Sequence, residues 1–215
     1  MLMTKPHRVL LADDHALLLD AFRTLLEPHF EIVGTATDGR ELVKLAAQLK
    51  PEVIVTDISM PLLNGLDAGS KIKKLQPEVK LVFVTVNEDP DLVAEAFRIG
   101  GNGYLLKSSA ASELFKAIEV VMGGGKYVTP LITGAMIGSL LKDPSERDTQ
   151  HILTTRQREI LQLLAEGKTM KEAASILCVT SRTVAFHKYR IMEDLCIKTN
   201  SELIHYAIKQ GLICI

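Results

Sequence analysis

The chain has 215 residues, of which 47% are hydrophobic and 24% charged, a composition typical of a water-soluble globular protein with room for two small domains. No apolar run reaches the roughly 18–20 residues of a membrane span, and the first residues, MLMTKPHR, lack the apolar stretch of a signal peptide. We therefore expect a cytoplasmic protein that does not act at a membrane. Residues 1–150 carry 16 basic and 20 acidic side chains, whereas residues 151–215 carry 9 and 6. An acidic first part and a basic second part indicate separate functions.

The three cysteines are odd in number and follow no metal-ligand spacing. They are Cys178, Cys196 and Cys214. We expect reduced thiols with a structural role.

The first 122 residues alternate between two hydrophobic patterns. Short β-branched or aliphatic runs predict strands at 8–12, 31–36, 52–56, 81–85 and 103–106. Stretches with helical periodicity follow them at 16–27, 39–49, 66–75, 90–99 and 110–122. Five strands alternating with five helices predict a doubly wound α/β domain with a five-stranded parallel sheet.

A connecting segment is predicted next. The run Gly-Gly-Gly at 123–125 stops the preceding helix, and Thr129 and Pro130 predict the start of a short helix that ends near Leu141. Its apolar face would comprise Ile132, Met136, Ile137 and Leu140. Residues 142–151 are polar and without period, so we interpret them as the interdomain linker.

From Thr154 onward the strand pattern is replaced by helical periodicity. Successive helices are predicted from TTRQREILQLLAEG, from MKEAASILCV, over about 182–195, and from a capping box at Thr199 and Glu202 to Gly211. The predicted domains are 7–123, a linker with a short helix at 124–150, and a small all-helical domain at 151–215.

The residues that follow the predicted strands carry the chemistry of the first domain. Asp13 and Asp14 follow the first strand, Asp57 the third, Thr85 closes the fourth, and Lys107 follows the fifth. In a doubly wound sheet ligands bind at the carboxyl ends of the strands, so we expect these side chains to converge on one crevice. Helix capping would explain one of the two adjacent aspartates and leave the second without a reason.

Three crowded carboxylates require either protonation or a cation. Because the set has oxygen ligands and no Cys or His, it favours a hard ion, Mg²⁺. An aspartate can also act as a nucleophile toward phosphorus. Lys107 and the Thr85 hydroxyl would then bind oxygens of the transferred phosphoryl group.

Four motifs in this region resemble the receiver domain of bacterial two-component response regulators. They are ADD (12–14), VIVTDISMPLLNG (53–65), VFVT (82–85) and GYLLK (103–107). The resemblance implies that Asp57 accepts a phosphoryl group from a sensor histidine kinase. It implies further that Asp13, Asp14, Asp57 and the Ser59 carbonyl hold Mg²⁺, and that Thr85 and Tyr104 form a switch pair. The alternative for Tyr104 is an ordinary strand aromatic packed on a helix.

Three positions need separate interpretation. Val86 stands where the receiver family has a small residue, and its larger side chain would narrow access to Asp57. The pair Gly100-Gly101 makes the turn before GYLLK more flexible than is usual. His15 is interpreted as a partly exposed residue in the first turn of a helix, with a metal-binding role as the alternative.

The third helix of the second domain presents two different faces. Val184, Ile191 and Leu195 fall on the core side, whereas Phe186 and Tyr189 lie among basic residues on the opposite side. Exposed aromatics between arginines and a lysine suit a surface that enters a DNA groove. The alternative for Phe186 is packing against the first domain or the linker.

Residues 153–195 resemble the LuxR-type helix-turn-helix, and the whole chain resembles a response regulator of the NarL/FixJ class. The resemblance implies that the chain binds double-stranded DNA as a homodimer when phosphorylated. The implied DNA contacts are Arg182, Thr183, Ala185, Phe186, His187, Lys188, Tyr189 and Arg190, and the implied dimer contacts are Leu203, Ile204, Ala207 and Ile208. Ala185 and Tyr189 depart from the family, in which Lys or Arg is common there.

Two other functions are compatible with parts of the sequence. A Mg²⁺-dependent phosphatase with an aspartyl nucleophile would place a second Asp two residues after Asp57, where this chain has Ser59. An adaptor whose second domain binds a protein would explain the weakly basic third helix. We expect a regulator of transcription, not an enzyme.

Overall fold

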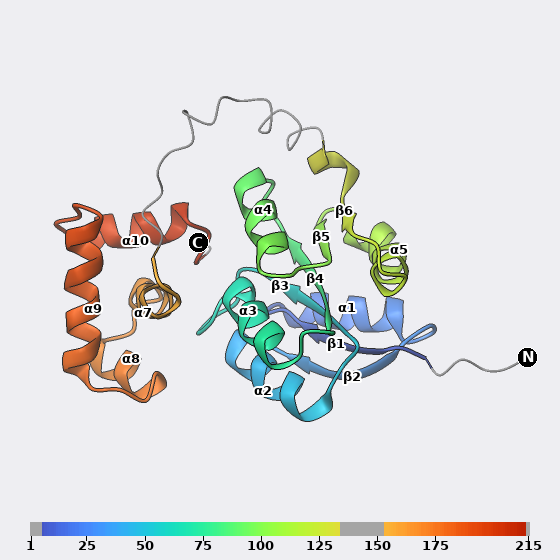
Figure 1. The fold of residues 1–215 in the computed structure, drawn as a ribbon, viewed down its shortest axis with the longest axis horizontal. Helices are drawn as coiled ribbons and strands as arrows, with labels where there is room; N and C mark the ends of the chain where they lie inside the picture. Colours follow the sequence, from blue (N-terminus) through green and yellow to red (C-terminus); the bar gives the residue numbers. More distant parts are fainter. Residues whose placement is uncertain (1–5, 134–152, 214–215) are drawn as a thin grey trace, which may run out of the picture.

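The computed structural model describes residues 6–133 and 153–213, which form an α/β unit and an all-helical unit (Figure 1). The α/β unit contains a parallel sheet with the strand order β2-β1-β3-β4-β5-β6. The first five strands are β1 (Arg8–Ala12), β2 (Glu31–Ala36), β3 (Val53–Asp57), β4 (Lys80–Thr85) and β5 (Gly103–Leu106). The strand order reverses between β1 and β3, so the carboxyl ends of these two strands flank the expected ligand site.

Helices cover both faces of this sheet. They are α1 (Ala16–Leu26), α2 (Gly39–Leu49), α3 (Gly65–Leu75), α4 (Pro90–Arg98) and α5 (Ala110–Met122). Alternate strand residues face opposite ways: Leu10 packs toward α2, α3 and α4, whereas Val9 and Leu11 pack toward α1 and α5. The predicted doubly wound fold is confirmed.

The sheet has a sixth strand, so the prediction of five strands is wrong by one. The two-residue strand β6 (Tyr127–Val128) pairs parallel to β5, in the segment that the sequence assigned to the linker. Thr129 fixes this edge because its Oγ1 accepts a hydrogen bond from the Leu106 N–H at 3.1 Å. Two residues are too few to show a strand period, which is why the pattern did not reveal β6.

Residues 130–133 are helical, and this helix begins at Pro130 as the sequence predicts. Ile132 is buried in the core of the α/β unit. The other residues of the predicted apolar face, together with the interdomain linker at 142–151, lie outside the described residues. The predicted linker limits therefore stay predictions.

The second unit is a compact bundle of four described helices. These are α7 (Thr155–Ala165), α8 (Met170–Ile176), α9 (Ser181–Asp194) and α10 (Asn200–Lys209). Capping boxes begin α7, α8 and α10, and the box predicted at Thr199 and Glu202 is one of them. The short turn between α8 and α9 gives the helix-turn-helix arrangement that the sequence predicts.

The cysteines that the structure describes carry free thiols. Cys178 and Cys196 are exposed and lie at positive φ, in the turns that follow α8 and α9. Cys214 lies outside the described residues.

Among the described helices, none combines the length and the apolar character that crossing a membrane requires.

Candidate phosphoacceptor site and nucleic-acid interface

The strand ends bring three of the predicted charged groups into direct contact. Lys107 follows β5, and its Nζ lies 2.8 Å from Asp57 Oδ2 and 2.8 Å from Asp13 Oδ2. Both carboxylates are buried, whereas Lys107 is only partly so. One ammonium therefore neutralises part of the charge of two carboxylates that come from different strands.

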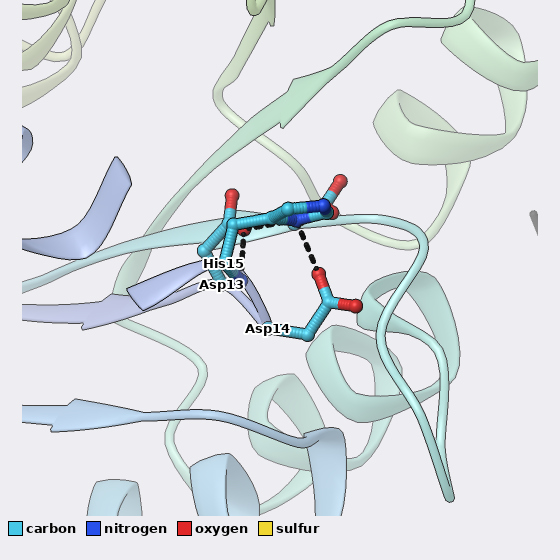
Figure 2. A group of neighbouring side chains, drawn as sticks. Asp13, Asp14 and His15 are labelled. Atoms are coloured by element: carbon cyan, nitrogen blue, oxygen red, sulfur yellow. Dashed lines mark hydrogen bonds and ion pairs between the residues drawn. The ribbon is translucent and has the colours of Figure 1, made fainter. Parts of the chain in front are cut away.

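Asp14 and His15 complete this cluster from the turn after β1 (Figure 2). The His15 Nδ1 lies 3.1 Å from Asp13 Oδ1 and 2.8 Å from Asp14 Oδ1, and Asp13 also accepts a hydrogen bond from the His15 N–H. His15 is itself the N-cap residue of α1, so neither aspartate serves as the cap. The interpretation of His15 as a first-turn residue is therefore wrong by one position, and its ring contacts both acids.

The donor set is suited to a divalent cation. Ligand atoms of Asp13, Asp14, His15 and Asp57 all lie within 4.8 Å of one another. Burial raises the pKa of the Asp57 carboxyl above its ordinary value, because desolvation outweighs the attraction of the Lys107 ammonium. Burial acts to lower the pKa of Lys107, but bonds to Asp13 and Asp57 raise it overall. Crowded carboxylate oxygens with one partial counter-charge fit a hard ion such as Mg²⁺.

The predicted switch residues are both hydrogen-bonded to Asn87. The Tyr104 ring is fully buried, and its hydroxyl donates to the Asn87 carbonyl at 2.9 Å. The Asn87 N–H donates to Thr85 Oγ1 at 3.2 Å. Burial raises the pKa of the Tyr104 hydroxyl, so it stays a donor at neutral pH. The loop after β4 is thus connected to both side chains.

The loop after β3 approaches the site closely. The Ser59 N–H donates to Asp57 Oδ1 at 3.2 Å, and a Cβ on Gly65 would lie only 2.0 Å from the Asp57 carbonyl oxygen. Gly65 is therefore required for this turn. The exposed side chain of Val86 lines the same cavity as Asp57, and its effect on access to Asp57 stays a prediction.

Helix α9 carries its aromatic residues on the surface. Val184 and Ile191 are fully buried, whereas Phe186 and Tyr189 are 64% and 61% exposed. The exposure of Phe186 contradicts the alternative in which it packs against the first domain, and the linker named in the same alternative lies outside the described residues. In Figure 1, α9 lies on the side of the helical unit that faces away from the sheet. The basic residues of this face include Lys188, whose Nζ lies 5.7 Å from the centre of the Tyr189 ring.

The predicted dimer contacts on α10 are mostly not surface residues. Leu203 and Ala207 are buried in the core of the helical unit, because their periodicity places them against α7. Ile208 is partly buried in a cavity that it shares with Leu92 of α4. Only Ile204, at 37% exposed, remains available among the four.

A polar stripe formed by α7 and its C-cap residue Glu166 joins the two units, and the sequence pattern did not predict this contact. Gln162 is fully buried: its Nε2 donates to the Met60 carbonyl at 2.8 Å, and its Oε1 accepts from the Asn64 N–H at 2.8 Å. The other contacts of the stripe are made by Arg158, Glu159 and Glu166. Spacing of three and four residues is its only sequence signal, and solvated helix faces have the same pattern.

The fold and the site define a doubly wound α/β domain with an acidic cluster at its strand ends, joined to a helix-turn-helix domain. Residues 9–119 match the family of response regulator receiver domains, and residues 151–207 match the bacterial regulatory proteins of the luxR family. The chain belongs to the response regulators of two-component systems, in the class that carries a LuxR-type DNA-binding domain. This membership decides against the phosphatase, since the class consists of regulators of transcription and not of enzymes.

Relatives match almost the whole chain. The transcriptional regulatory protein MctR of Rhizobium johnstonii is 34% identical over 208 residues, which are 96% of this chain and 95% of that protein. The oxygen regulatory protein NreC of Staphylococcus carnosus is 35% identical over 214 residues, covering 96% and 99%. A structure of the response regulator RcsB of Salmonella typhimurium has a TM-score of 0.65 at 26% identity and covers 94% of this chain and 97% of that one. An RcsB–DNA complex has a TM-score of 0.59 at 26% identity, and the match covers 94% of this chain and 98% of the RcsB chain.

Proposed function

We propose that Asp57 is the phosphoacceptor of this response regulator and that a sensor histidine kinase is its phosphodonor. The observation that carries the proposal is the contact of the Lys107 ammonium with both Asp57 and Asp13. An Asp57 carboxylate oxygen forms a bond to phosphorus while the bond between phosphorus and the histidine nitrogen breaks. The nitrogen keeps the electron pair, and the product is an acyl phosphate on Asp57.

The neighbouring residues bind and orient the group that is transferred. Lys107 would move from a carboxylate to a phosphoryl oxygen, and Thr85 would donate its hydroxyl to another. Asp13, Asp14, Asp57 and the Ser59 carbonyl would hold Mg²⁺, which neutralises phosphoryl charge when bound. We assign direct metal contact to Asp14, because it is the more exposed of the adjacent pair, and a water-mediated contact to the buried Asp13.

The helical unit binds DNA, and we propose that it does so through α9 as a homodimer. Arg182, Lys188 and Arg190 supply positive charge for phosphates, while Phe186 and Ala185 supply apolar contacts for thymine methyl groups. The remaining predicted contacts are Thr183, His187 and Tyr189. The exposure of Phe186 and Tyr189 supports this assignment.

Phosphorylation would act on the contact between the two units. We propose that a phosphoryl group on Asp57 weakens the packing of the receiver on α7 and favours dimers, with Thr85 and Tyr104 as the coupling pair. The shared bonds of Thr85 and Tyr104 to Asn87 support the coupling. Ile204 is the residue of α10 that we retain as a dimer contact.

Labelling with acetyl phosphate and Mg²⁺ tests the acceptor. The wild-type chain should incorporate phosphate and Asp57→Ala should not, whereas Asp20→Ala, which changes an exposed aspartate of α1, should label normally. Equal labelling of wild type and Asp57→Ala would refute the assignment. Selection from random DNA duplexes should enrich an element with two half-sites; no enrichment with the phosphorylated protein would favour the adaptor.

A further inference from the structure

The cavity around Asp57 is built by both units of the chain. It has a volume of about 230 Å³, and Asp14, Asp57 and Lys107 line it from the receiver. Glu166, which follows α7, and Ile213, which follows α10, line it from the helical unit. A carboxylate of the DNA-binding domain therefore lies in the wall of the phosphoacceptor site.

Glu166 is fixed in this wall by two donors. Its Oε1 accepts hydrogen bonds from the Leu62 N–H at 3.0 Å and from the Gln162 Nε2 at 2.8 Å. Its partial burial raises the pKa of the carboxyl above the ordinary value, because burial disfavours the charged form. A second anion in the same cavity would be repelled by this partly exposed carboxylate.

The helical unit also contacts the loop that connects the phosphoacceptor Asp57 to α3. Leu62 of this loop has a left-handed backbone with φ of 65°, and its side chain packs against the core of the helical unit. Gln162 bonds to the backbone on both sides of it, at Met60 and Asn64. A strained conformation of this kind persists only where its surroundings enforce it, and here these surroundings include the other domain as well as the receiver.

We propose that the docked DNA-binding domain restrains the receiver's own phosphorylation, with the Glu166 carboxylate as the repelling group and Gln162 as a positioning residue. The inference rests on Asp57 being the phosphoacceptor. Docking leaves Phe186 and Tyr189 of α9 exposed and places Glu166 and Ile213 in the lining of the cavity around Asp57. Since coupling between two equilibria is reciprocal, a phosphoryl group that weakens docking must itself be disfavoured by docking.

The test compares initial rates of phosphate incorporation from acetyl phosphate in full-length variants with Mg²⁺ present. Glu166→Gln keeps the shape and the acceptor oxygen but removes the charge that would repel an incoming phosphate group, so we expect it to react about 3–10 times faster than wild type. The matched control is Glu193→Gln, an exposed residue of α9 with the same change of charge, which should react at the wild-type rate. The advantage of Glu166→Gln should shrink at high ionic strength, which a purely structural role would not cause.

A second variant and a second measurement keep the result decisive. Gln162→Ala should also react faster, and the Leu62 and Asn64 amides should lose protection from hydrogen exchange in it. Adding beryllofluoride, a mimic of the phosphoryl group, to the wild type with Mg²⁺ should lower the protection of the same amides. If wild type labels on Asp57 while both variants react at its rate, the inference is overturned and the acceptor assignment stands. If neither the wild type nor any variant incorporates phosphate, both the inference and the acceptor assignment are overturned.

Discussion

Arg158 of the DNA-binding domain lies 3.3 Å from Asp67 of the receiver, measured from its Nε to the Asp67 Oδ2, and its Nη1 contacts Glu95 of α4. Burial raises the pKa of Asp67, although the Arg158 guanidinium acts against this. Asp67 also accepts a hydrogen bond from the Asn64 side chain, which in turn contacts Gln162. The charged and neutral parts of the interface are therefore one connected network.

The first prediction concerns this ion network. Replacing Arg158 by Met leaves Asp67 buried beside Glu95 without a cation, and removing one partner of a buried pair is strongly unfavourable. We expect domain docking to lose about 2–4 kcal/mol of free energy. Hydrogen exchange of the Leu62 and Asn64 amides measures the change, because both N–H groups bond to α7.

Arg98 provides the matched control for Arg158. It contacts the same Glu95 carboxylate at 3.7 Å, but its side chain is 65% exposed. Exposed pairs contribute at most about 1 kcal/mol, so Arg98→Met should leave the two amides protected. Equal loss of protection in the two variants would show that Arg158 does not hold the interface.

The second prediction is a pH dependence of docking. The pKa of Glu166 is raised in the docked chain by burial, against the opposing effects of Gln162, the Leu62 N–H, Lys168 and Arg40. A carboxyl with a raised pKa binds its proton more tightly in the docked state. Docking is therefore strongest at a pH below the ordinary pKa of a glutamate and weakens as the pH rises through the raised pKa of Glu166. Protection factors of the Leu62 amide, corrected for intrinsic exchange, should fall over this range.

Asp67, whose pKa burial also raises, is a second carboxyl of this interface, and the Arg158 guanidinium opposes the rise of its pKa. It faces Arg158, Asn64, Glu95 and Glu159. Glu166→Gln should therefore reduce the pH dependence without abolishing it. An unchanged dependence in Glu166→Gln would mean that Glu166 does not titrate with docking.

The third prediction concerns Mg²⁺ and stability. Because burial raises the pKa of Asp57, its charged form destabilises the fold, and Asp57→Asn should unfold at a higher temperature than wild type when no Mg²⁺ is present. Adding Mg²⁺ at 100 times its dissociation constant should stabilise the wild type by about 2.7 kcal/mol. Asp57→Asn should gain far less, and Asp20→Asn should match the wild type. Thermal unfolding with and without Mg²⁺ separates these outcomes, and equal stabilisation of all three would place the metal elsewhere.

Much of the α/β unit could be predicted because strand and helix periods differ clearly in this sequence. The predicted fourth strand, 81–85, differs by one residue from β4, and the predicted strand ends are sufficient to place Asp57, Thr85 and Lys107 at one edge of the sheet. Strands β1 and β5 have the predicted limits. Such agreement follows from a parallel sheet, whose topology fixes the edge at which chemical groups meet.

The contact between the domains could not be predicted in the same way. Arg158, Gln162 and Glu166 have the spacing of a solvated helix face. Only the folded chain shows that Gln162 and Glu166 bond to backbone groups of the loop after β3, and that Arg158 contacts carboxylates of α3 and α4. The prediction that Leu203 and Ala207 are dimer contacts is wrong for a related reason. An apolar stripe on α10 is equally suited to a partner chain and to its own core, and here the core contains it.

The last prediction separates the DNA-reading face of α9 from its core face. Phe186 is exposed, so Phe186→Ala should leave the unfolding free energy within about 0.5 kcal/mol of wild type. It should weaken binding to the selected DNA element by about 1–3 kcal/mol, because the Phe186 ring no longer buries apolar surface against the bases. Lys188→Ala should weaken binding to all duplexes alike and reduce the slope of log affinity against log salt by about 1. Leu75→Ala, which removes an exposed apolar side chain of the receiver, should change neither the affinity for DNA nor the slope with salt. Fluorescence anisotropy over a range of salt concentrations measures both effects. Unchanged affinity in Phe186→Ala together with an unchanged slope in Lys188→Ala would exclude α9 as the helix that enters the groove.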